Sequence, residues 1–135
     1  MHERVVWNLE TNCNLDLEVG QTFIDTHWQI AANARPRMRT NVTHSLAGRH
    51  TGVVQGEFVL QDSTFAATGA TSVELNFTGN GLQWWRGTLD GGSVGFRNTG
   101  RMRLDSNSTV TLKGTLTNAS VMELSNNSIY FDNAT

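Results

Sequence analysis

An internal repeat in the second half of the chain constrains the fold more than any other feature of the sequence. Segments 86–108 and 113–135 align without gaps, as RGTLDGGSVGFRNTGRMRLDSNS over KGTLTNASVMELSNNSIYFDNAT. Within each copy, apolar residues recur at every second position, which is the period of a β-strand. Glycine and asparagine separate these short runs, as turns require. A repeated unit of three short strands predicts a solenoid of stacked coils.

The repeat therefore predicts an all-β fold, a right-handed parallel β-helix with about 27 residues per coil. Equivalent residues would then stack about 4.8 Å apart, the spacing of neighbouring strands. An antiparallel β-sandwich is the alternative, because short strands joined by turns also suit that fold. The residues that we expect to be buried in stacked columns are Leu89, Leu116, Val94, Val121, Leu104 and Phe131.

The 135 residues correspond to one domain with two differently patterned parts. Residues 53–135 are assigned to the solenoid coils. Residues 1–52 lack a clear copy of the repeat, and we expect them to form an irregular N-terminal cap or first coils. The end coils of a solenoid differ from the inner ones because one face has no neighbour.

The repeat segments GTLDGGSV and GTLTNASV, followed by short apolar strands and Asn/Ser turns, resemble right-handed β-helix repeats. Such repeats occur in passenger regions of autotransporter and filamentous-haemagglutinin-like adhesins and in phage tail proteins. The resemblance covers residues 53–135 and implies an extracellular, surface-exposed or virion-borne fibre element. It implies no catalytic residue.

Composition narrows the choice of partners. The chain has 10 Lys+Arg and 12 Asp+Glu, a formal net charge of −2, which argues against a nucleic-acid-binding protein. The single cysteine, Cys13, excludes an intrachain disulfide framework. No run of apolar residues is long enough to predict a membrane span. The first residues, MHER, lack the apolar stretch of a signal peptide.

Two groups of arginines are candidate ligand contacts. Arg35, Arg37 and Arg39 alternate along the chain, so that in an extended segment their guanidinium groups share one face. Arg101 and Arg103 share a face in the same way. Guanidinium groups suit carboxylate, sulfate and phosphate. Pairing with nearby Asp or Glu is the simpler alternative to a glycan or another anionic ligand.

A tryptophan pair is the other candidate contact. Trp84 and Trp85 are adjacent, so one side chain is expected to point inward and the other outward. In the repeat alignment Trp85 matches Leu112, which predicts that Trp85 is in the core. Trp84 would then be exposed beside Arg86, where an indole can contact a sugar ring or another protein.

Catalytic and metal sites are not indicated. Asp105 and Asp132 align in the repeat at positions where aspartate caps turns, although a paired role in catalysis or cation binding is the alternative. Thr115-Leu116-Thr117 aligns with Thr88-Leu89-Asp90, so a threonine ladder like that of β-solenoid ice binders fails after one step. The four histidines lack the paired spacing of zinc ligands, so no zinc site is predicted. They are His2, His27, His44 and His50.

The sequence thus predicts a non-enzymatic structural or adhesive element of a surface or virion fibre, without a cofactor. Association with itself, or with adjacent coils of a longer chain, is expected at the solenoid ends, where unpaired strand edges recruit further strands. The alternative is a glycan-binding or glycan-processing β-helix. Its contact residues would be Trp84, Arg86, Arg35, Arg37, Arg39, Arg101 and Arg103.

Overall fold

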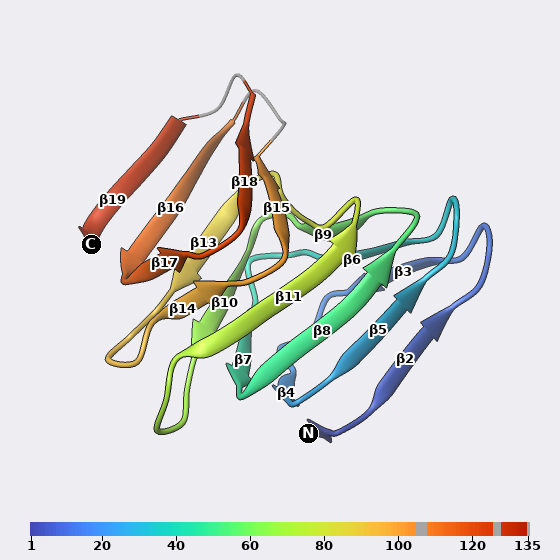
Figure 1. Ribbon diagram of the computed structural model, residues 1–135, viewed down its shortest axis with the longest axis horizontal. Coiled ribbons are helices and arrows are strands. Elements are labelled where there is room, and N and C mark those ends of the chain that lie inside the picture. The colour runs from blue at the N-terminus through green and yellow to red at the C-terminus, as the bar shows by residue number, and fades with distance from the viewer. Residues whose placement is uncertain (105–107, 126–127, 135) are drawn as a thin grey trace.

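The protein is a parallel β-solenoid of about six coils. The computed structural model describes residues 1–104, 108–125 and 128–134, and within these ranges the chain forms strands and turns but no helix. It follows that this part of the chain has no helix that could span a membrane. Figure 1 shows the strands stacked side by side, with the two termini at opposite ends of the stack.

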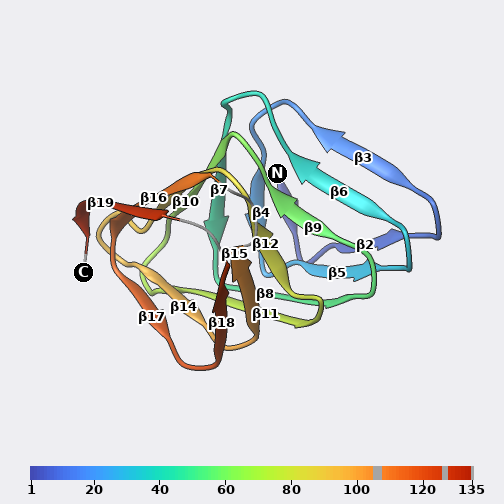
Figure 2. The ribbon, with the colours of Figure 1, turned by 90° about the horizontal axis from the view of Figure 1, so that it is seen from above.

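Each coil contributes one strand to each of three sheets, and Figure 2 shows these sheets on different sides of the molecule. Sheet A contains β1 (His2–Glu3), β4 (Thr22–Ile24), β7 (Thr43–Ala47), β10 (Ser63–Ala67), β13 (Gly87–Asp90), β16 (Thr109–Gly114) and β19 (Ser128–Ala134). Sheet B contains β2 (Val6–Leu9), β5 (His27–Ile30), β8 (Arg49–Val54), β11 (Val73–Gly79), β14 (Phe96–Asn98) and β17 (Leu116–Asn118). Sheet C contains β3 (Asn14–Leu17), β6 (Arg35–Met38), β9 (Phe58–Leu60), β12 (Leu82–Trp84), β15 (Arg101–Leu104) and β18 (Val121–Leu124).

The coil length differs from the prediction: one coil takes about 22 residues, not 27. The step along the chain between paired residues also varies, being shorter from Thr109 to Ser128 than from Arg49 to Glu74. The turns absorb these differences, because a turn can gain or lose residues without disturbing the strands that it joins. No single period therefore describes the chain.

The two copies of the GTL motif illustrate the error in the predicted register. Leu89 lies in β13 of sheet A, whereas Leu116 begins β17 of sheet B. The true neighbour of Leu89 is Leu112, and that of Leu116 is Phe96. The predicted offset of 27 residues is longer than one coil of about 22, so it matches a residue in one sheet with a residue in the next sheet.

Burial of the predicted columns follows the true register. Leu89 and Leu104 are buried as expected, whereas Val94 and Leu116 are only half-buried. Val121 and Phe131 are 49% and 60% exposed, contrary to the prediction. Val121 pairs with Arg101 on the outer face of sheet C, so it does not belong to a core column. Phe131 does continue a core column, but it lies in the last described coil.

Residues 1–52 form the first coils of the same solenoid, which is one of the two arrangements expected for them. Strands β1 to β8 pair in parallel with their neighbours in all three sheets. This part of the core is aromatic: the rings of Trp7 and Trp28 stack at 5.0 Å, and Trp28 packs against Phe58. Gly52 follows Trp28 in this column, and a Cβ there would lie 2.8 Å from the ring of Phe77. The missing side chain leaves room for these rings.

Candidate functional site

The outer face of sheet C brings together most of the arginines that were predicted as ligand contacts. The alternating pattern of β6 places Arg35 and Arg37 outward, and Pro36 and Met38 inward. The same alternation in β15 places Arg101 and Arg103 outward. Strands β9 and β12 lie between β6 and β15, so the two arginine groups are about 14 Å apart at about 4.8 Å per strand.

A continuous outward column runs across the whole of sheet C. Its members, paired in register from strand to strand, are Asp16, Arg37, Val59, Gln83, Arg103 and Glu123. Carboxylates stand at both ends, each beside an arginine, and the two middle residues are uncharged. The two arginine clusters that the sequence indicates separately thus belong to one surface.

The N-terminal arginine cluster consists of Arg35, Arg37 and Arg39. Asp16 pairs with the last two of these. Its carboxylate accepts hydrogen bonds from Arg37 Nε at 2.7 Å and from Arg37 Nη2 at 2.9 Å. Arg39 Nη1 donates to the same carboxylate at 3.3 Å. The hydrogen bond with Arg37 lowers the pKa of Asp16 below its ordinary value, and the charge of Arg39 adds to this effect. The third arginine, Arg35, forms an ion pair with Glu57.

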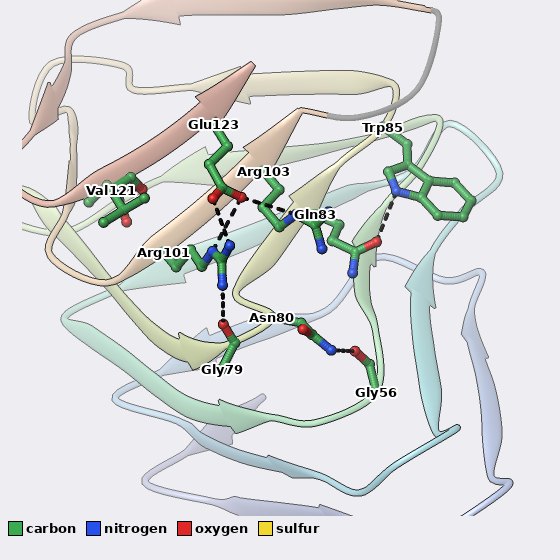
Figure 3. Close-up of polar contacts among 10 residues, drawn as sticks. Gly56, Gly79, Asn80, Gln83, Trp85, Arg101, Arg103, Val121 and Glu123 are labelled. Atoms are coloured by element: carbon green, nitrogen blue, oxygen red, sulfur yellow. Dashed lines mark hydrogen bonds and ion pairs between the residues drawn. The ribbon is translucent and has the colours of Figure 1, made fainter. Parts of the chain in front are cut away.

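Glu123 holds the second cluster in the same way (Figure 3). Arg101 Nη2 donates to Glu123 Oε1 at 2.6 Å, and Arg103 Nε lies 3.2 Å from Glu123 Oε2. Arg101 also donates from Nη1 to the carbonyl oxygen of Gly79 at 3.2 Å. The hydrogen bond with Arg101 lowers the pKa of Glu123. Both arginines of this cluster, like the three of the N-terminal cluster, are therefore ion-paired, which is the simpler of the two roles considered for them.

The tryptophan pair has the opposite orientation to the prediction. Trp84 is completely buried, and its Nε1 donates to the carbonyl oxygen of Gly87 at 3.2 Å. Trp85 is half-buried on the outer face of sheet C. Its Nε1 donates to Gln83 Oε1 at 3.1 Å (Figure 3). Its ring centre lies 5.8 Å from the guanidinium carbon of Arg35. The wrong register, which matched Trp85 with Leu112, caused this error.

A polar groove of about 470 Å³ adjoins this face where sheet B turns into sheet C. Arg35 and Glu57 line it, and Asn80 Nδ2 donates to the carbonyl oxygen of Gly56 at 2.9 Å (Figure 3). The same nitrogen donates to the carbonyl oxygen of Gln55, also at 2.9 Å. The remaining lining residues are Asn14, Asn33 and Ala34. These amides were not among the residues predicted from the sequence, although their recurrence beside turns is the signal that could have identified them.

Arg86 lies away from the sheet C face. It follows β12, and its Nη2 donates to Asp62 Oδ2 at 2.7 Å. Both residues line a second groove of about 300 Å³ that leads toward sheet A. Of the predicted contact residues, Trp84 is thus excluded by burial, Arg86 belongs to a different groove, and the five other arginines share one surface.

Sheet A carries a threonine column that the predicted period concealed. Thr43, Thr64, Thr88 and Thr111 pair in register on its outer face. Charged residues flank this column on both sides, in the ion pairs Arg86–Asp62 and Lys113–Asp132. The column is a single row, unlike the paired rows of the Thr-x-Thr pattern.

The predicted acidic and histidine residues are dispersed. Asp132 pairs in register with Lys113, and Asp105 lies outside the described residues. His44 and His50 are buried in the bore, and burial lowers the pKa of each to about 4. In the described ranges, no group of three or more His, Cys, Asp or Glu side chains could hold a metal ion.

Comparison with known proteins identifies no relative. The chain has no significant match to a protein-family model, a curated protein or a solved structure. The fold and the side-chain geometry are therefore the basis for any proposal about its function.

Proposed function

We propose that this protein is a non-enzymatic structural element that associates through the C-terminal end of its solenoid with a second copy of itself. The observation that supports the proposal most directly is the exposure of core positions in the last described coil. Phe131 is 60% exposed although Leu112, its partner in register, is 4% exposed. Leu124 is 55% exposed although its partner Leu104 is fully buried.

These side chains belong to one apolar surface bordered by unpaired strand edges. Among the strands that the structure describes, each of β17, β18 and β19 has a neighbour on one side only, so its backbone groups on the other side can pair with an added strand. Leu116, Met122 and Ile129, which pack against the core of the preceding coil, complete the apolar surface. A further coil would bury these residues as each inner coil buries those of its neighbour.

The N-terminal end is better covered. Trp7, Leu15 and Leu17 of the first coil are half-buried, so none of these core-facing side chains is as open to water as Phe131. Trp7 stacks face to face on Trp28, which removes much of its ring from water. The C-terminal end therefore has more to gain from association, at about 25 cal/mol per Å² of apolar surface buried.

The setting that we propose is a surface or virion fibre, where a rigid stack of coils would serve a structural or adhesive role. This part of the proposal is supported by the resemblance of the repeats to those of adhesins and phage tail proteins. The absence of catalysis is proposed because the acidic side chains of the sheet C face serve as partners for arginines.

Light scattering coupled to size exclusion, over a series of micromolar concentrations, tests the association. We expect the mass to rise with concentration, and Phe131→Glu to keep the protein monomeric because it places a charge on the apolar surface. Phe131 is already exposed, so this substitution should leave the fold intact. Val53→Glu is the matched control, since Val53 is 43% exposed in sheet B, away from that end. A strictly monomeric wild-type protein would contradict the proposal.

A further inference from the structure

We propose that the polar groove beside Trp85 binds an uncharged carbohydrate chain, with the indole of Trp85 as the surface on which a sugar ring stacks. This site uses the outer face of sheet C and the adjoining turn, and not the C-terminal end of the solenoid. It is therefore independent of the proposed self-association.

The chemistry of the groove matches a ligand that is rich in hydroxyl groups. Its volume of about 470 Å³ falls within the range of about 300–1,000 Å³ that small-molecule sites occupy. Four primary amides line it, and a primary amide carries both hydrogen-bond donors and an acceptor, as a sugar hydroxyl does. These amides belong to Asn14, Asn33, Gln55 and Asn80. In Asn80 both N–H groups bond to main-chain oxygens, so this amide offers a ligand its acceptor oxygen. An apolar ligand would have to desolvate these groups without replacing their hydrogen bonds.

Part of this groove is held in place before any ligand binds. The two hydrogen bonds from Asn80 Nδ2 to main-chain oxygens fix the orientation of its amide. Figure 3 shows the bond to Gly56. The ion pair between Arg35 and Glu57 fixes two further lining side chains. Because these side chains already hold each other in place, ligand binding costs less side-chain entropy.

Arg35 connects the groove with the indole. It lines the groove, and its guanidinium carbon lies 5.8 Å from the ring centre of Trp85. The two features are therefore neighbours on one surface. A chain that places hydroxyl groups in the groove can reach the indole with the next ring.

The indole of Trp85 is positioned as a platform. Val59 lies outside the core cluster, between Arg37 and Gln83 in the outward column, and yet it is completely buried. Trp85 is hydrogen-bonded to Gln83 on one side of Val59 and lies near Arg35 on the other, so we infer that its ring covers Val59. Trp85 itself keeps part of its surface exposed. A ring that is apolar and already ordered can accept the CH face of a sugar at little entropic cost.

The ion pairs favour an uncharged sugar over an acidic one. Arg37 and Arg39 share Asp16, Arg101 and Arg103 share Glu123, and Arg35 pairs with Glu57. An acidic ligand would have to displace a carboxylate from these arginines. It would also lie close to that carboxylate, where like charges repel. Hydroxyl groups can instead add hydrogen bonds to the paired groups.

Affinity gel electrophoresis with soluble polysaccharides tests the proposal. The uncharged probes are hydroxyethylcellulose, xyloglucan, galactomannan, mannan and dextran, and the acidic probe is polygalacturonate. We expect at least one uncharged polymer to retard the protein. Trp85→Ala and Gln55→Ala should each weaken that retardation, the former by about tenfold in dissociation constant. Trp85→Phe, which keeps an aromatic ring, should weaken it by less.

Arg97→Ala is the matched control, because Arg97 is an exposed arginine of β14 in sheet B, away from the groove. Far-ultraviolet circular dichroism and thermal unfolding of each variant check that the fold is retained. Absence of retardation by all five uncharged polymers would overturn the proposal, and so would retardation by polygalacturonate alone. Retardation that Trp85→Ala and Gln55→Ala leave unchanged would overturn it as well. If Trp85→Ala changes the mass measured by light scattering instead, the indole is a protein contact and the proposal is wrong.

Discussion

Leu112 lies in register beside Leu89 across β13 and β16, and the two side chains are 4% and 0% exposed. The column to which they belong begins at His44 and continues through Phe65 to Phe131. Each residue of this column rests on the one in the neighbouring coil. The stability of one coil therefore depends on the side chains of the next.

We expect Leu112→Ala to lower the free energy of unfolding by about 2–5 kcal/mol, as large-to-small substitutions in a core do. Leu116→Ala should cost clearly less, because Leu116 is half-buried in the last described coil. Urea unfolding of both variants measures the difference. Equal losses would contradict the observed register, in which Leu112 is a core residue of sheet A and Leu116 begins the edge strand of sheet B.

Gly52→Ala should destabilise the aromatic part of the core. The new Cβ would lie 2.8 Å from Phe77 Cδ1 and 2.9 Å from the carbonyl oxygen of Trp28, both too close for ordinary contact. Overpacking of this kind costs about 1–3 kcal/mol. Thermal unfolding measures the loss, and Gly69→Ala serves as a comparison because its nearest neighbour would be Ala47 Cβ at 3.5 Å. The positive φ of Gly69 adds some backbone strain to that comparison variant. The wild-type protein is therefore the reference, and the prediction fails if Gly52→Ala unfolds at the wild-type temperature.

The buried histidines should make the protein sensitive to mild acid. Burial lowers the pKa of His44 and His50 from 6.5 to about 4, so the unfolded chain binds more protons than the folded one below pH 6.5. Their contribution to the free energy of unfolding is complete above pH 6.5 and is lost as the pH falls toward 4. At about 1.4 kcal/mol per pKa unit, each histidine accounts for at most about 3 kcal/mol.

Urea unfolding at neutral pH and in mild acid, just above the folded-state pKa values, measures this effect. His44→Phe should reduce the pH dependence, because it replaces a buried titrating ring with one that cannot be protonated. His27→Gln is the control, since His27 is half-buried on the outer face of sheet B and bonds to Thr51. An unchanged pH dependence in His44→Phe would contradict the contribution predicted for His44.

Polysaccharides should bind without being cleaved. Asp16 and Glu123 share their oxygens among arginines that lower their pKa values, which disfavours either as a general acid. A reducing-sugar assay with uncharged and acidic polymers should therefore show no turnover. Release of reducing ends that Glu57→Gln or Asp132→Asn abolishes would contradict this prediction.

Local features of the fold were predictable from the sequence, because they depend on residues close together in the chain. Alternation of apolar residues indicated short strands, and repetition of a three-strand unit indicated a parallel solenoid, which the structure confirms. The common face of Arg37 and Arg39 followed from the two-residue period of a strand, and both donate to Asp16. The neighbour that each strand meets in the next coil was not predictable in this way.

The register between coils could be read only from the folded structure. The step from Thr109 to Ser128 is shorter than the step from Arg49 to Glu74 because the turns differ in length, and the matching GTL motifs stand in different sheets. Trp84 is buried because it lies in register with the core residue Leu60 in sheet C, whereas the predicted match of Trp85 with Leu112 compared it with a residue of sheet A. Local sequence patterns specify a chain that coils through strands with one inward and one outward face. The contacts between coils decided which side chains share the outer face of sheet C, because those contacts join residues that no local pattern connects.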